Sequence, residues 1–393
     1  MNAARLPSLQ ALPLTLYVHM PWCVRKCPYC DFNSHQLKSA APSDDYIDAL
    51  IRDFEAEIPA LGGRTIEAIF FGGGTPSLFA PEAFARLLRA FAARCQVAVD
   101  AEVTLEANPG TIERGRFAGY RDAGINRVSL GAQTFAPGAL ARLGRIHSPE
   151  DTYRAVDELR AARLDNFNLD LMYALPEQTL DEALEDVRRA CALAPSHISH
   201  YQLTLEPGTV FHSRPPPLPD EDLAFQMQTE CQSLLAQNGF EQYEVSAYAR
   251  AGARCRHNLN YWRFGDYVGI GAGAHGKITA SLPHGVHRTE KARQPRAYLE
   301  QLAGTAHGPG LIGERKAVAA GDLPFEFVLN ALRLNEGFAL EDFESRTGLE
   351  ASAVEPKLRS ALARGLVEFA EPRWRASGLG RRFLNDLQAG FLP

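Results

Sequence analysis

Short apolar segments alternate with longer amphipathic segments through the first half of the chain. The apolar segments are rich in β-branched and aromatic residues, which is typical of buried strands. They cover residues 15–20, 66–73, 101–108, 127–134, 166–175 and 197–206. Between them, apolar residues recur every three or four positions and predict helices. These helices are expected at residues 43–58, 81–95, 111–124, 148–164 and 180–193.

Six strands separated by helices predict parallel pairing, because each helix carries the chain back to the start of the next strand. We therefore expect an α/β fold in which residues 10–250 form a partial (β/α)6 parallel barrel. In a fold of this kind, chemistry gathers at the carboxyl ends of the strands.

The pattern changes after the sixth predicted strand. A proline-rich connector (214–220), a helix (219–239) and a strand (240–249) are predicted next. They are followed by a segment that carries a motif (251–312), which ends in a surface loop from residue 280, and by a small, mainly helical, winged-helix-like C-terminal domain (313–393). A winged helix prompts the question of DNA binding. Residues 311–393 contain 11 Lys or Arg against 12 Asp or Glu, and a DNA-binding wing needs a basic face. We expect this domain to cover the barrel or to bind a protein partner.

Composition adds limits rather than a function. The 393 residues are 46% hydrophobic and 22% charged, with a net charge of −6, so nucleic acid is not an expected partner. No apolar run is long enough to span a bilayer, and the first twenty residues lack the apolar core of a signal peptide. We expect a cytoplasmic protein whose thiols are reduced.

Three of the seven cysteines lie close together in the stretch CVRKCPYCDF. Cys23, Cys27 and Cys30 follow the first predicted strand, and their spacing suits a metal centre. A zinc ion would need a fourth ligand, and an iron–sulfur cluster is the other interpretation; spacing alone leaves both open. The nearby candidates for a fourth zinc ligand are His19, Asp31 and His35. The cysteines outside this cluster are Cys95, Cys191, Cys231 and Cys255, of which the first three are expected to be small apolar residues in helices.

Polar residues follow several of the other predicted strands. The segment Gly72–Pro76 (GGGTP) ends the second strand, Glu106 and Asn108 end the third, Gln133 ends the fourth, and Asp170 lies in the fifth. Glycines without a Cβ allow a ligand to approach the backbone closely. A plain tight turn explains the glycines equally well, and a buried ion pair would explain the two carboxylates. Their joint position at one end of the predicted sheet favours a shared site.

The combination of Cys-x3-Cys-x2-Cys, an aromatic residue (Tyr29) before the last cysteine, and GGGTP after the second strand resembles the radical S-adenosylmethionine (SAM) superfamily. The resemblance implies that Cys23, Cys27 and Cys30 bind three irons of a [4Fe–4S] cluster. It also implies that SAM chelates the fourth iron, so three thiols are a complete set. In that family, electron transfer from the cluster cleaves SAM to a 5′-deoxyadenosyl radical.

The segments YVHMPWC, FFGGGTPS, LEANPG, RVSLGAQTF, LGRIH and NLDLMYALP resemble oxygen-independent coproporphyrinogen III oxidase and its relatives over more than half of the chain. This likeness implies roles for particular residues. Tyr17 would lie beside the cluster and the sulfonium, and Arg145 would pair with the carboxylate of SAM. The amino and methionine end of SAM would be contacted by Gly73, Gly74 and Thr75. The ribose and nearby polar groups would be held by Glu106, Gln133 and Asp170. Without the resemblance, Arg145 would pass for a surface charge.

Two features separate branches of this group. Coproporphyrinogen oxidases are expected to carry a further cysteine where this chain has Phe32, and an apolar ring there would shield the site. Residues His257, Asn258, Tyr261 and Trp262 form the H-N-x-x-Y-W pattern that resembles HemW-type haem chaperones. A neutral imidazole is a common axial haem ligand, and aromatic faces suit a macrocycle. In this interpretation Asn258 would orient the His257 ring through its other nitrogen.

Other interpretations of this segment stay open. His257 and Asn258 would also suit a hydrogen-bonded turn, with Tyr261 and Trp262 in a core. Cys255 is a second candidate haem ligand and His275 a candidate neighbour of the haem, while the glycines of GIGAGAHG would let backbone pack near the cofactor.

The resemblance implies a haem chaperone that carries a [4Fe–4S] cluster, SAM and haem and hands haem to apo-haemoproteins, of which respiratory enzymes are one class. The alternative is a porphyrinogen-decarboxylating enzyme. A third interpretation is that the cluster and SAM act as a regulatory sensor. An electron donor would be a further partner if SAM is cleaved, and the sequence leaves enzymatic activity undecided.

Overall fold

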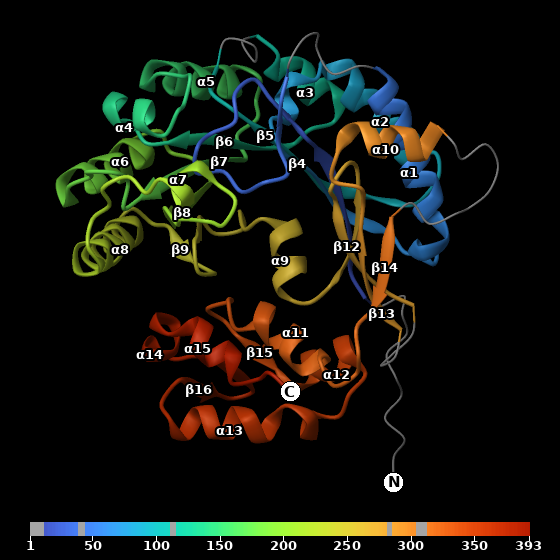
Figure 1. Cartoon of the computed structure of the whole chain (residues 1–393), viewed down its shortest axis with the longest axis vertical. Coiled ribbons are helices and arrows are strands. Elements are labelled where there is room, and N and C mark those ends of the chain that lie inside the picture. The colour runs from blue at the N-terminus through green and yellow to red at the C-terminus, as the bar shows by residue number, and fades with distance from the viewer. Residues whose placement is uncertain (1–11, 38–43, 111–114, 281–284, 304–312) are drawn as a thin grey trace.

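The computed structural model describes residues 12–37, 44–110, 115–280, 285–303 and 313–393. Its centre is a parallel sheet with helices on its outer face (Figure 1). The parallel strands are β1 (Leu14–Met20), β4 (Ile66–Gly73), β5 (Val97–Ala107), β6 (Arg127–Gln133), β7 (Phe167–Tyr173) and β8 (His197–Gln202). The helices among them are α1 (Asp44–Leu61), α2 (Pro81–Ala92), α3 (Phe117–Ala123), α4 (Pro137–Arg142), α5 (Pro149–Ala161) and α6 (Leu180–Ala192). The predicted order of strands and helices is confirmed, with the short helix α4 as an addition that was not predicted. Residues 111–114 of the helix predicted at 111–124 lie outside the described residues.

Further strands extend this sheet at both edges, in the order β14-β13-β12-β11-β1-β4-β5-β6-β7-β8-β10-β9. The added elements are α7 (Val210–Ser213), α8 (Glu221–Gln237), β9 (Glu241–Gln242), β10 (Ala247–Ala249), α9 (Arg256–Trp262), β11 (Asp266–Ile270), β12 (His275–Thr279), β13 (Val286–Glu290), α10 (Pro295–Ala303) and β14 (Glu314–Ala317). Two short strands, β2 (Trp22–Cys23) and β3 (His35–Gln36), pair with each other beside the cysteine loop. Strand β11 joins β1 in parallel, and the edge strands β14 and β9 are not paired with each other in the described residues. The partial barrel is therefore open.

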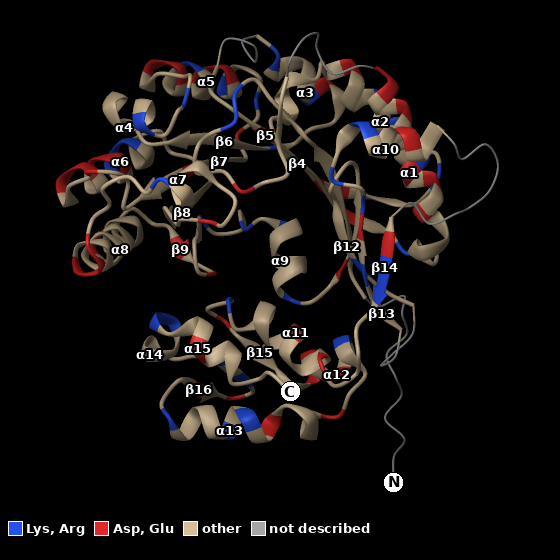
Figure 2. Ribbon diagram, in the orientation of Figure 1, with Lys and Arg blue, Asp and Glu red and all other residues tan. Residues whose placement is uncertain are grey.

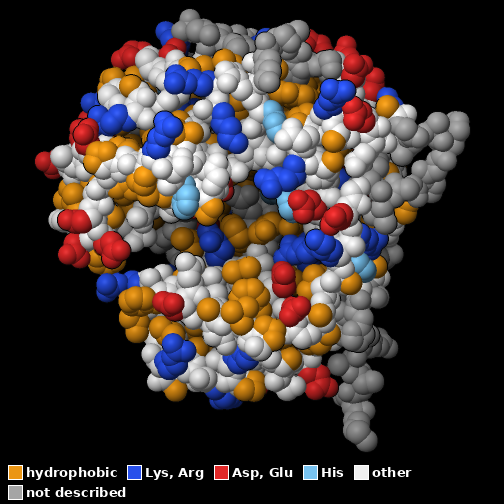
Figure 3. Space-filling view, in the orientation of Figure 1, with side chains coloured by type: hydrophobic (Ala, Val, Ile, Leu, Met, Phe, Trp, Pro, Cys, Tyr) orange, Lys and Arg blue, Asp and Glu red, His pale blue; other side chains and the backbone are white. Residues whose placement is uncertain are grey.

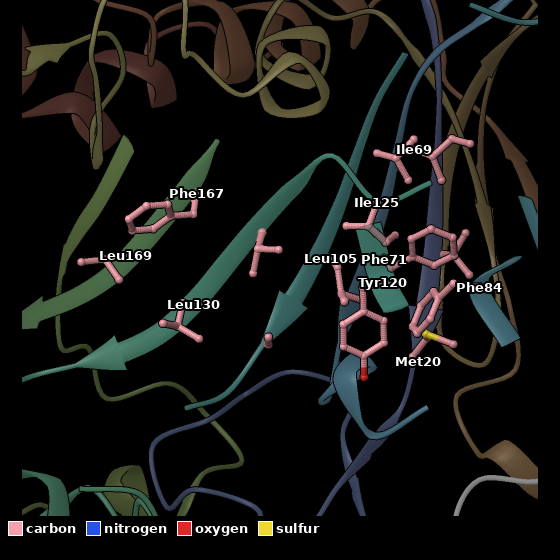
Figure 4. Packing of buried hydrophobic residues seen from close by; sticks show 14 of the residues in the cluster. Met20, Ile69, Phe71, Phe84, Leu105, Tyr120, Ile125, Leu130, Phe167 and Leu169 are labelled. Carbon is pink, nitrogen blue, oxygen red and sulfur yellow. The ribbon is translucent and has the colours of Figure 1, made fainter. Parts of the chain in front are cut away.

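Alternation along the strands decides which side chains face the helices and which face the barrel interior. Ile69 and Phe71 of β4 point toward the helices, where Phe71 packs edge-on against Phe84 of α2 with ring centroids 5.0 Å apart (Figure 4). Leu105 and Leu130 of the neighbouring strands join the same apolar layer. The opposite, inward positions are mostly polar, so the barrel interior is available for chemistry rather than for core packing.

Two expectations for the middle of the chain were wrong. The segment predicted as one strand at 240–249 forms two short strands, β9 and β10, which pair with each other in antiparallel orientation. The surface loop expected over 280–312 contains strand β13 and helix α10, whose residues Tyr298 and Leu302 are fully buried. Strand β13 forms by pairing with the preceding strand β12, whereas α10 packs against α1, which is more than two hundred residues away in sequence. Residues 281–284 and 304–312 lie outside the described residues.

The C-terminal residues form a small unit with a three-stranded sheet, as a winged helix does. Its elements are α11 (Leu323–Ala331), β15 (Phe338–Ala339), α12 (Leu340–Thr347), α13 (Glu355–Ala363), β16 (Val367–Ala370), β17 (Arg373–Ala376), α14 (Gly378–Arg382) and α15 (Leu384–Ala389). Helix α9 lies between this unit and the sheet (Figure 1). Phe264, just after α9, packs edge-on against Phe327 of α11 at a centroid distance of 5.7 Å. The C-terminal unit therefore meets the barrel at α9, and it also contacts β13 through Glu326 and Arg288 and the turn before β10 through Arg333 and Glu244.

Figure 2 shows many of the charged residues on the outer helices, including α1, α5, α6 and α8. In the described part of the chain, no helix is both long enough and apolar enough to cross a bilayer.

One ion cluster is buried completely between α1 and the strand extension. Lys291 Nζ contacts Asp53 Oδ1 at 2.8 Å and Glu57 Oε1 at 2.5 Å, and these side chains are 0–4% exposed. Tyr298 and the Gly271 N–H donate to the other oxygen of Asp53 at 2.7 and 3.0 Å. One cation therefore compensates two carboxylates away from water.

Replacing this lysine is expected to be costly. Lys291→Met leaves two buried carboxylates without their cation and should lower the free energy of unfolding by roughly 3–5 kcal/mol. Urea denaturation measures the loss. Lys316→Met is the control, since Lys316 pairs with Glu314 on the surface, where both side chains are more than 70% exposed, and should change stability by less than about 0.5 kcal/mol. Equal effects in the two variants would contradict this account.

Candidate functional site

A cavity of about 500 Å³ opens at the carboxyl ends of the parallel strands. Figure 3 shows the molecule hollowed near the centre of the face in view. The sequence-predicted residues that line the cavity are Cys23, Cys27, Tyr29, Cys30, Gly73, Gly74, Thr75, Glu106, Asn108, Gln133, Arg145 and Asp170. The fold brings them together from five strands and the loops that follow these strands, because parallel strands end at the same edge of the sheet.

Each of the three clustered thiols has a polar neighbour. Thr75 Oγ1 lies 3.5 Å from Cys23 Sγ, Arg145 Nη1 lies 3.8 Å from Cys27 Sγ, and Ser34 Oγ lies 3.9 Å from Cys30 Sγ. Donors of this kind stabilise a metal-bound thiolate and tune its metal centre. Burial raises the pKa of Cys23 and Cys30, so metal binding, which needs thiolates, would release protons from these groups.

The loop does not resemble a zinc site. Two thiolates on one zinc ion lie about 3.8 Å apart, given Zn–S bonds of about 2.3 Å in a tetrahedron. Among the described residues, no three His, Cys, Asp or Glu side chains are close enough to share one ion. His19 is also engaged through both nitrogens, at 2.9 Å from Tyr17 Oη and 2.9 Å from Asn33 O, and His35 Nε2 faces Arg293 O. Three thiols spread over separate irons of a cluster fit this geometry better.

The glycines of GGGTP are required by close packing. Gly73 has φ of +112°, and a Cβ there would lie 2.4 Å from the His19 ring. A Cβ on Gly74 would lie 2.6 Å from Trp22 O, directly beside the cysteine loop. The two glycines therefore let the end of β4 pack against β1 and the loop, and the Gly73 N–H is used by Glu106 Oε2 at 3.0 Å.

Two carboxyls make the cavity suited to a cationic ligand. Burial and the nearby Asp170 carboxyl together raise the pKa of Glu106 to about 8, while the hydrogen bond from the Gly73 N–H opposes the shift. Burial also raises the pKa of Asp170, although Asn168 and Ser129 donate to its two oxygens at 2.8 and 3.1 Å. A bound sulfonium or ammonium group would stabilise the charged form of these carboxyls and lower their pKa. The cavity therefore fits SAM, whose methionine end carries both groups.

Arg145 lies at the cavity wall in the loop after α4. Its guanidinium donates to Asn108 Oδ1 and to Gly131 O at 2.9 Å, and Nε has no hydrogen-bond partner in the structure. This half-buried cation is placed to meet an anionic group such as a carboxylate. Gln133 has the left-handed φ of +65° at the end of β6 and accepts from Tyr201 Oη at 2.9 Å.

Several cavity residues were missed at the sequence level. Ser129, Met172, Ser199 and Tyr201 line the cavity beside the predicted residues. Met172 is two residues after Asp170 on β7, so strand alternation counted from Asp170 would have found it. Ser129, Ser199 and Tyr201 lie on the neighbouring strands β6 and β8, so finding them requires the register of the sheet, in which Ser199 pairs with Asp170.

Tyr17 differs from expectation. It does not line the cavity, although it was expected beside the cluster; it lies one layer deeper, where burial raises its pKa and the Glu106 carboxyl adds to the shift. Alternation along β1 points both Tyr17 and His19 inward, and His19 is the one nearer the carboxyl end. Phe32 lies at the cavity rim and is 58% exposed, so it shields the site less than expected.

The H-N-x-x-Y-W motif lies at the other end of the barrel, on α9. The Arg256 N–H donates to Glu102 Oε1 at 2.8 Å, and Asn260 donates to Thr15 Oγ1 at 3.2 Å and to Asp266 O at 2.7 Å. These partners lie in the amino-terminal parts of β5, β1 and β11. Helix α9 therefore docks toward the amino-terminal ends of the strands, but the His257 ring reaches inward to within 6.1 Å of the Tyr17 ring, the layer directly below the cavity.

His257 points from α9 into the barrel and is 7% exposed. Its Nδ1 has no hydrogen-bond partner in the structure, so Asn258 does not orient the ring through that nitrogen. Tyr261 packs against Tyr267 and Trp262 with centroid distances of 4.9 Å each. Trp262 also lies under the Arg333 guanidinium at 4.3 Å. Both aromatics are half-buried, and they face β11 and the C-terminal unit.

The remaining candidates near this motif have other surroundings. Cys255 is fully buried at the start of α9, while His275 on β12 is exposed. The glycines of GIGAGAHG were expected near a haem. Two of them, Gly271 and Gly273, instead lie against the end of β1 and the cysteine loop, where a Cβ on Gly271 would be 2.4 Å from His19 O and a Cβ on Gly273 2.1 Å from the Asn33 side chain.

Buried histidines make stability depend on pH. Burial lowers the pKa of His200, stacked on Tyr173 at 4.7 Å, to about 4, whereas an exposed imidazole titrates near 6.5. The stabilisation that His200 provides is complete above about pH 6.5 and is lost as the pH falls from there to about 4. Its size is roughly 3 kcal/mol.

Replacing this ring by one that does not titrate is the test. Urea denaturation at pH 7 and pH 4.5 is expected to show a smaller drop in unfolding free energy for His200→Phe than for the wild-type chain. Parallel pH profiles of the two proteins would contradict the assignment.

Comparison with known proteins places these features in a family. The profile of the Radical SAM superfamily matches residues 17–190, and that of the HemN C-terminal domain matches residues 318–383. The protein named heme chaperone HemW of Escherichia coli K12 is 48% identical over 97% of this chain and 98% of its own length. The heme chaperone HemW of Haemophilus influenzae is 47% identical over 97% and 98%.

A more distant relative and a solved structure agree with this placement. The mouse protein named radical S-adenosyl methionine domain-containing protein 1, mitochondrial, is 34% identical over 98% of this chain and 89% of its own length. Coproporphyrinogen III oxidase (HemN) of E. coli has the same fold, with a TM-score of 0.81 over 97% of this chain and 90% of that one, at 23% identity. From the HemW matches over nearly the whole length, together with the three-thiol cavity, it follows that this chain belongs to the HemW-type family of the radical SAM superfamily.

Proposed function

We propose that this protein is a haem chaperone that binds haem and delivers it to apo-haemoproteins. The observation that carries the proposal is 47–48% identity over nearly the whole chain with two proteins named heme chaperone HemW. The H-N-x-x-Y-W motif on α9 supplies His257 as the candidate axial ligand. A neutral imidazole is needed for that role, and burial keeps the pKa of His257 at about 4.

The cavity at the other end of the barrel would hold a [4Fe–4S] cluster and SAM. Cys23, Cys27 and Cys30 would bind the cluster, and the donors Thr75, Arg145 and Ser34 beside their sulfurs support this role. A bound cluster supplies one-electron chemistry. The list of residues proposed to contact SAM is Tyr29, Gly73, Gly74, Thr75, Glu106, Gln133, Arg145 and Asp170. Tyr17 would act from the layer below.

The proposal divides the chain into three parts with different tasks. Residues 10–250 would hold the cluster and SAM, residues 251–312 would bind haem, and residues 313–393 would contribute to the binding of acceptor proteins. Respiratory haem enzymes are the proposed class of acceptor. A reduced electron-transfer protein would be a further partner if SAM is cleaved.

The second candidate is an enzyme that decarboxylates a porphyrinogen, and the shared fold with coproporphyrinogen III oxidase favours it. That similarity, at 23% identity, concerns the fold alone. Phe32, at the position where a further cysteine is expected in that enzyme, weighs against this candidate.

One preparation tests both functions. The protein is reconstituted anaerobically with iron and sulfide, and haem binding is followed by absorbance, then haem transfer to an apo-haemoprotein, then turnover of coproporphyrinogen III. We expect one haem per chain, transfer to the acceptor and no porphyrinogen turnover. Turnover of coproporphyrinogen III, or failure to bind haem, would overturn the proposal.

A further inference from the structure

His257 takes part in a stack of three rings inside the barrel. Its ring lies 5.1 Å from Phe70 and 6.1 Å from Tyr17, and the latter two rings are 6.3 Å apart. The planes within each pair differ by only 25–30°. The three rings fill the barrel between α9 and the level of Glu106. Tyr17 and Glu106 lie close to the same residue, since a Cβ on Gly72 would be 3.1 Å from both Tyr17 Cε2 and Glu106 Oε2.

A haem iron needs direct contact with a lone pair of its axial imidazole, with the flat macrocycle lying across it. The Nδ1 atom of His257 is buried and the whole residue is only 7% exposed. The macrocycle is many times wider than an imidazole and does not fit between α9 and the two rings. In the present arrangement, His257 is therefore part of the barrel interior and is not available to haem.

Helix α9 is held by polar contacts at both ends and by aromatic packing, in which Tyr261 lies against Tyr267 and Trp262 lies under Arg333. The Arg256 side chain reaches Asp100 at 3.2 Å, on the surface, and the Arg256 N–H bonds to Glu102 at 2.8 Å. Asn260 anchors the other end through Thr15 and Asp266. Exposed ion pairs contribute little to stability, and α9 is only seven residues long.

The segment also has glycines at both ends. Gly252, with φ of +79°, has no other atoms within 4 Å of the position of a Cβ. Gly265 follows Phe264, a non-glycine residue with φ of +57°. Backbone near such positions readily absorbs the rotations that a hinge needs.

We propose that haem binding displaces α9 from the barrel, so that His257 leaves the stack with Tyr17 and Phe70 and presents its ring to haem. This inference rests on the proposed haem-binding function and adds how that site is regulated: the ligand is stored in the barrel interior until α9 opens. The cost of leaving the stack lowers the apparent affinity for haem in proportion to the fraction of open molecules.

The kinetics of haem binding test the displacement. With the reconstituted full-length protein and haem in excess, the observed binding rate is expected to level off as haem concentration rises, because opening of α9 becomes limiting. Phe70→Leu removes one ring of the stack and should raise the plateau roughly two- to tenfold, the range expected for one aromatic pair. Phe71→Leu is the matched control, since Phe71 is the next residue of β4 and faces the helices. Its plateau should stay at the wild-type value.

Hydrogen exchange gives a second, independent measurement. Amides of residues 256–262 are expected to exchange faster with haem bound than without it. A binding rate that rises linearly with haem in wild type and Phe70→Leu alike, or slower exchange in α9 with haem bound, would overturn the displacement while leaving haem binding intact. Absence of haem binding by the wild-type protein would instead overturn the proposed function and this inference with it.

Discussion

The Cys27→Ala variant, reconstituted anaerobically with iron and sulfide, is expected to hold no [4Fe–4S] cluster. Three thiols are the whole protein contribution to the proposed centre, and two thiolates leave two irons without a protein ligand. Cys27 is also the thiol next to Arg145, the half-buried cation of the cavity wall. Iron and sulfide content should fall to the level of an unreconstituted sample, and the absorbance of the cluster should disappear.

A second cysteine variant serves as the control for general damage. Cys95 lies just beyond the end of α2, outside the cavity, and its Sγ contacts Phe91 O at 3.4 Å. Cys95→Ala removes one thiol of the same protein and should retain full iron and sulfide. Retention of a complete cluster by Cys27→Ala would show that the ligand assignment is wrong.

The second large effect is expected at His257. Two replacements, His257→Ala and His257→Phe, should each weaken haem binding at least about 100-fold, which corresponds to roughly 2.8 kcal/mol. Both remove the nitrogen ligand, but phenylalanine keeps a ring in the stack with Tyr17 and Phe70. The pair therefore separates loss of the ligand from collapse of the barrel interior. Titration of haem followed by absorbance measures both affinities.

A histidine on the surface, His212, provides the control. His212 on α7 bonds to Leu205 O and is remote from the motif in sequence. His212→Ala should bind haem as the wild-type chain does. If His257→Phe retains wild-type affinity, the axial ligand lies elsewhere, and Cys255 becomes the next residue to test.

Much of the cavity followed from local sequence features. Cys23, Cys27 and Cys30 are close in sequence, and GGGTP is adjacent to a predicted strand. Short-range sequence patterns were therefore enough to assign the cysteine loop and GGGTP to one site. Glu106 and Asp170 could be added because carboxyl ends of parallel strands share one edge of the sheet. Ser129 and Tyr201 escaped notice because an isolated serine or tyrosine in a strand carries no signal by itself.

Tyr17 and His257 show where pattern failed. The depth at which each of these two side chains lies in the barrel interior depends on the packing of the strands and on where α9 docks. Both are results of contacts between residues that are far apart in sequence. The sequence predicted a haem-type motif but gave no indication that the motif faces the amino-terminal end of the strands, buried against β1 and β4.

The sequence by itself determined the parallel α/β order of elements, the cysteine loop with its glycine partner, and the likeness to a cluster-binding family, because hydrophobic periodicity and short motifs are local properties of the chain. Only the tertiary structure decided that strands β11–β14 widen the sheet and that the C-terminal unit packs against α9, β13 and the turn before β10. It also decided that the two proposed sites occupy opposite ends of one barrel. These features arise from contacts between residues that can be more than two hundred positions apart, such as Asn260 with Thr15. A local sequence pattern does not show which distant residues will be buried against each other.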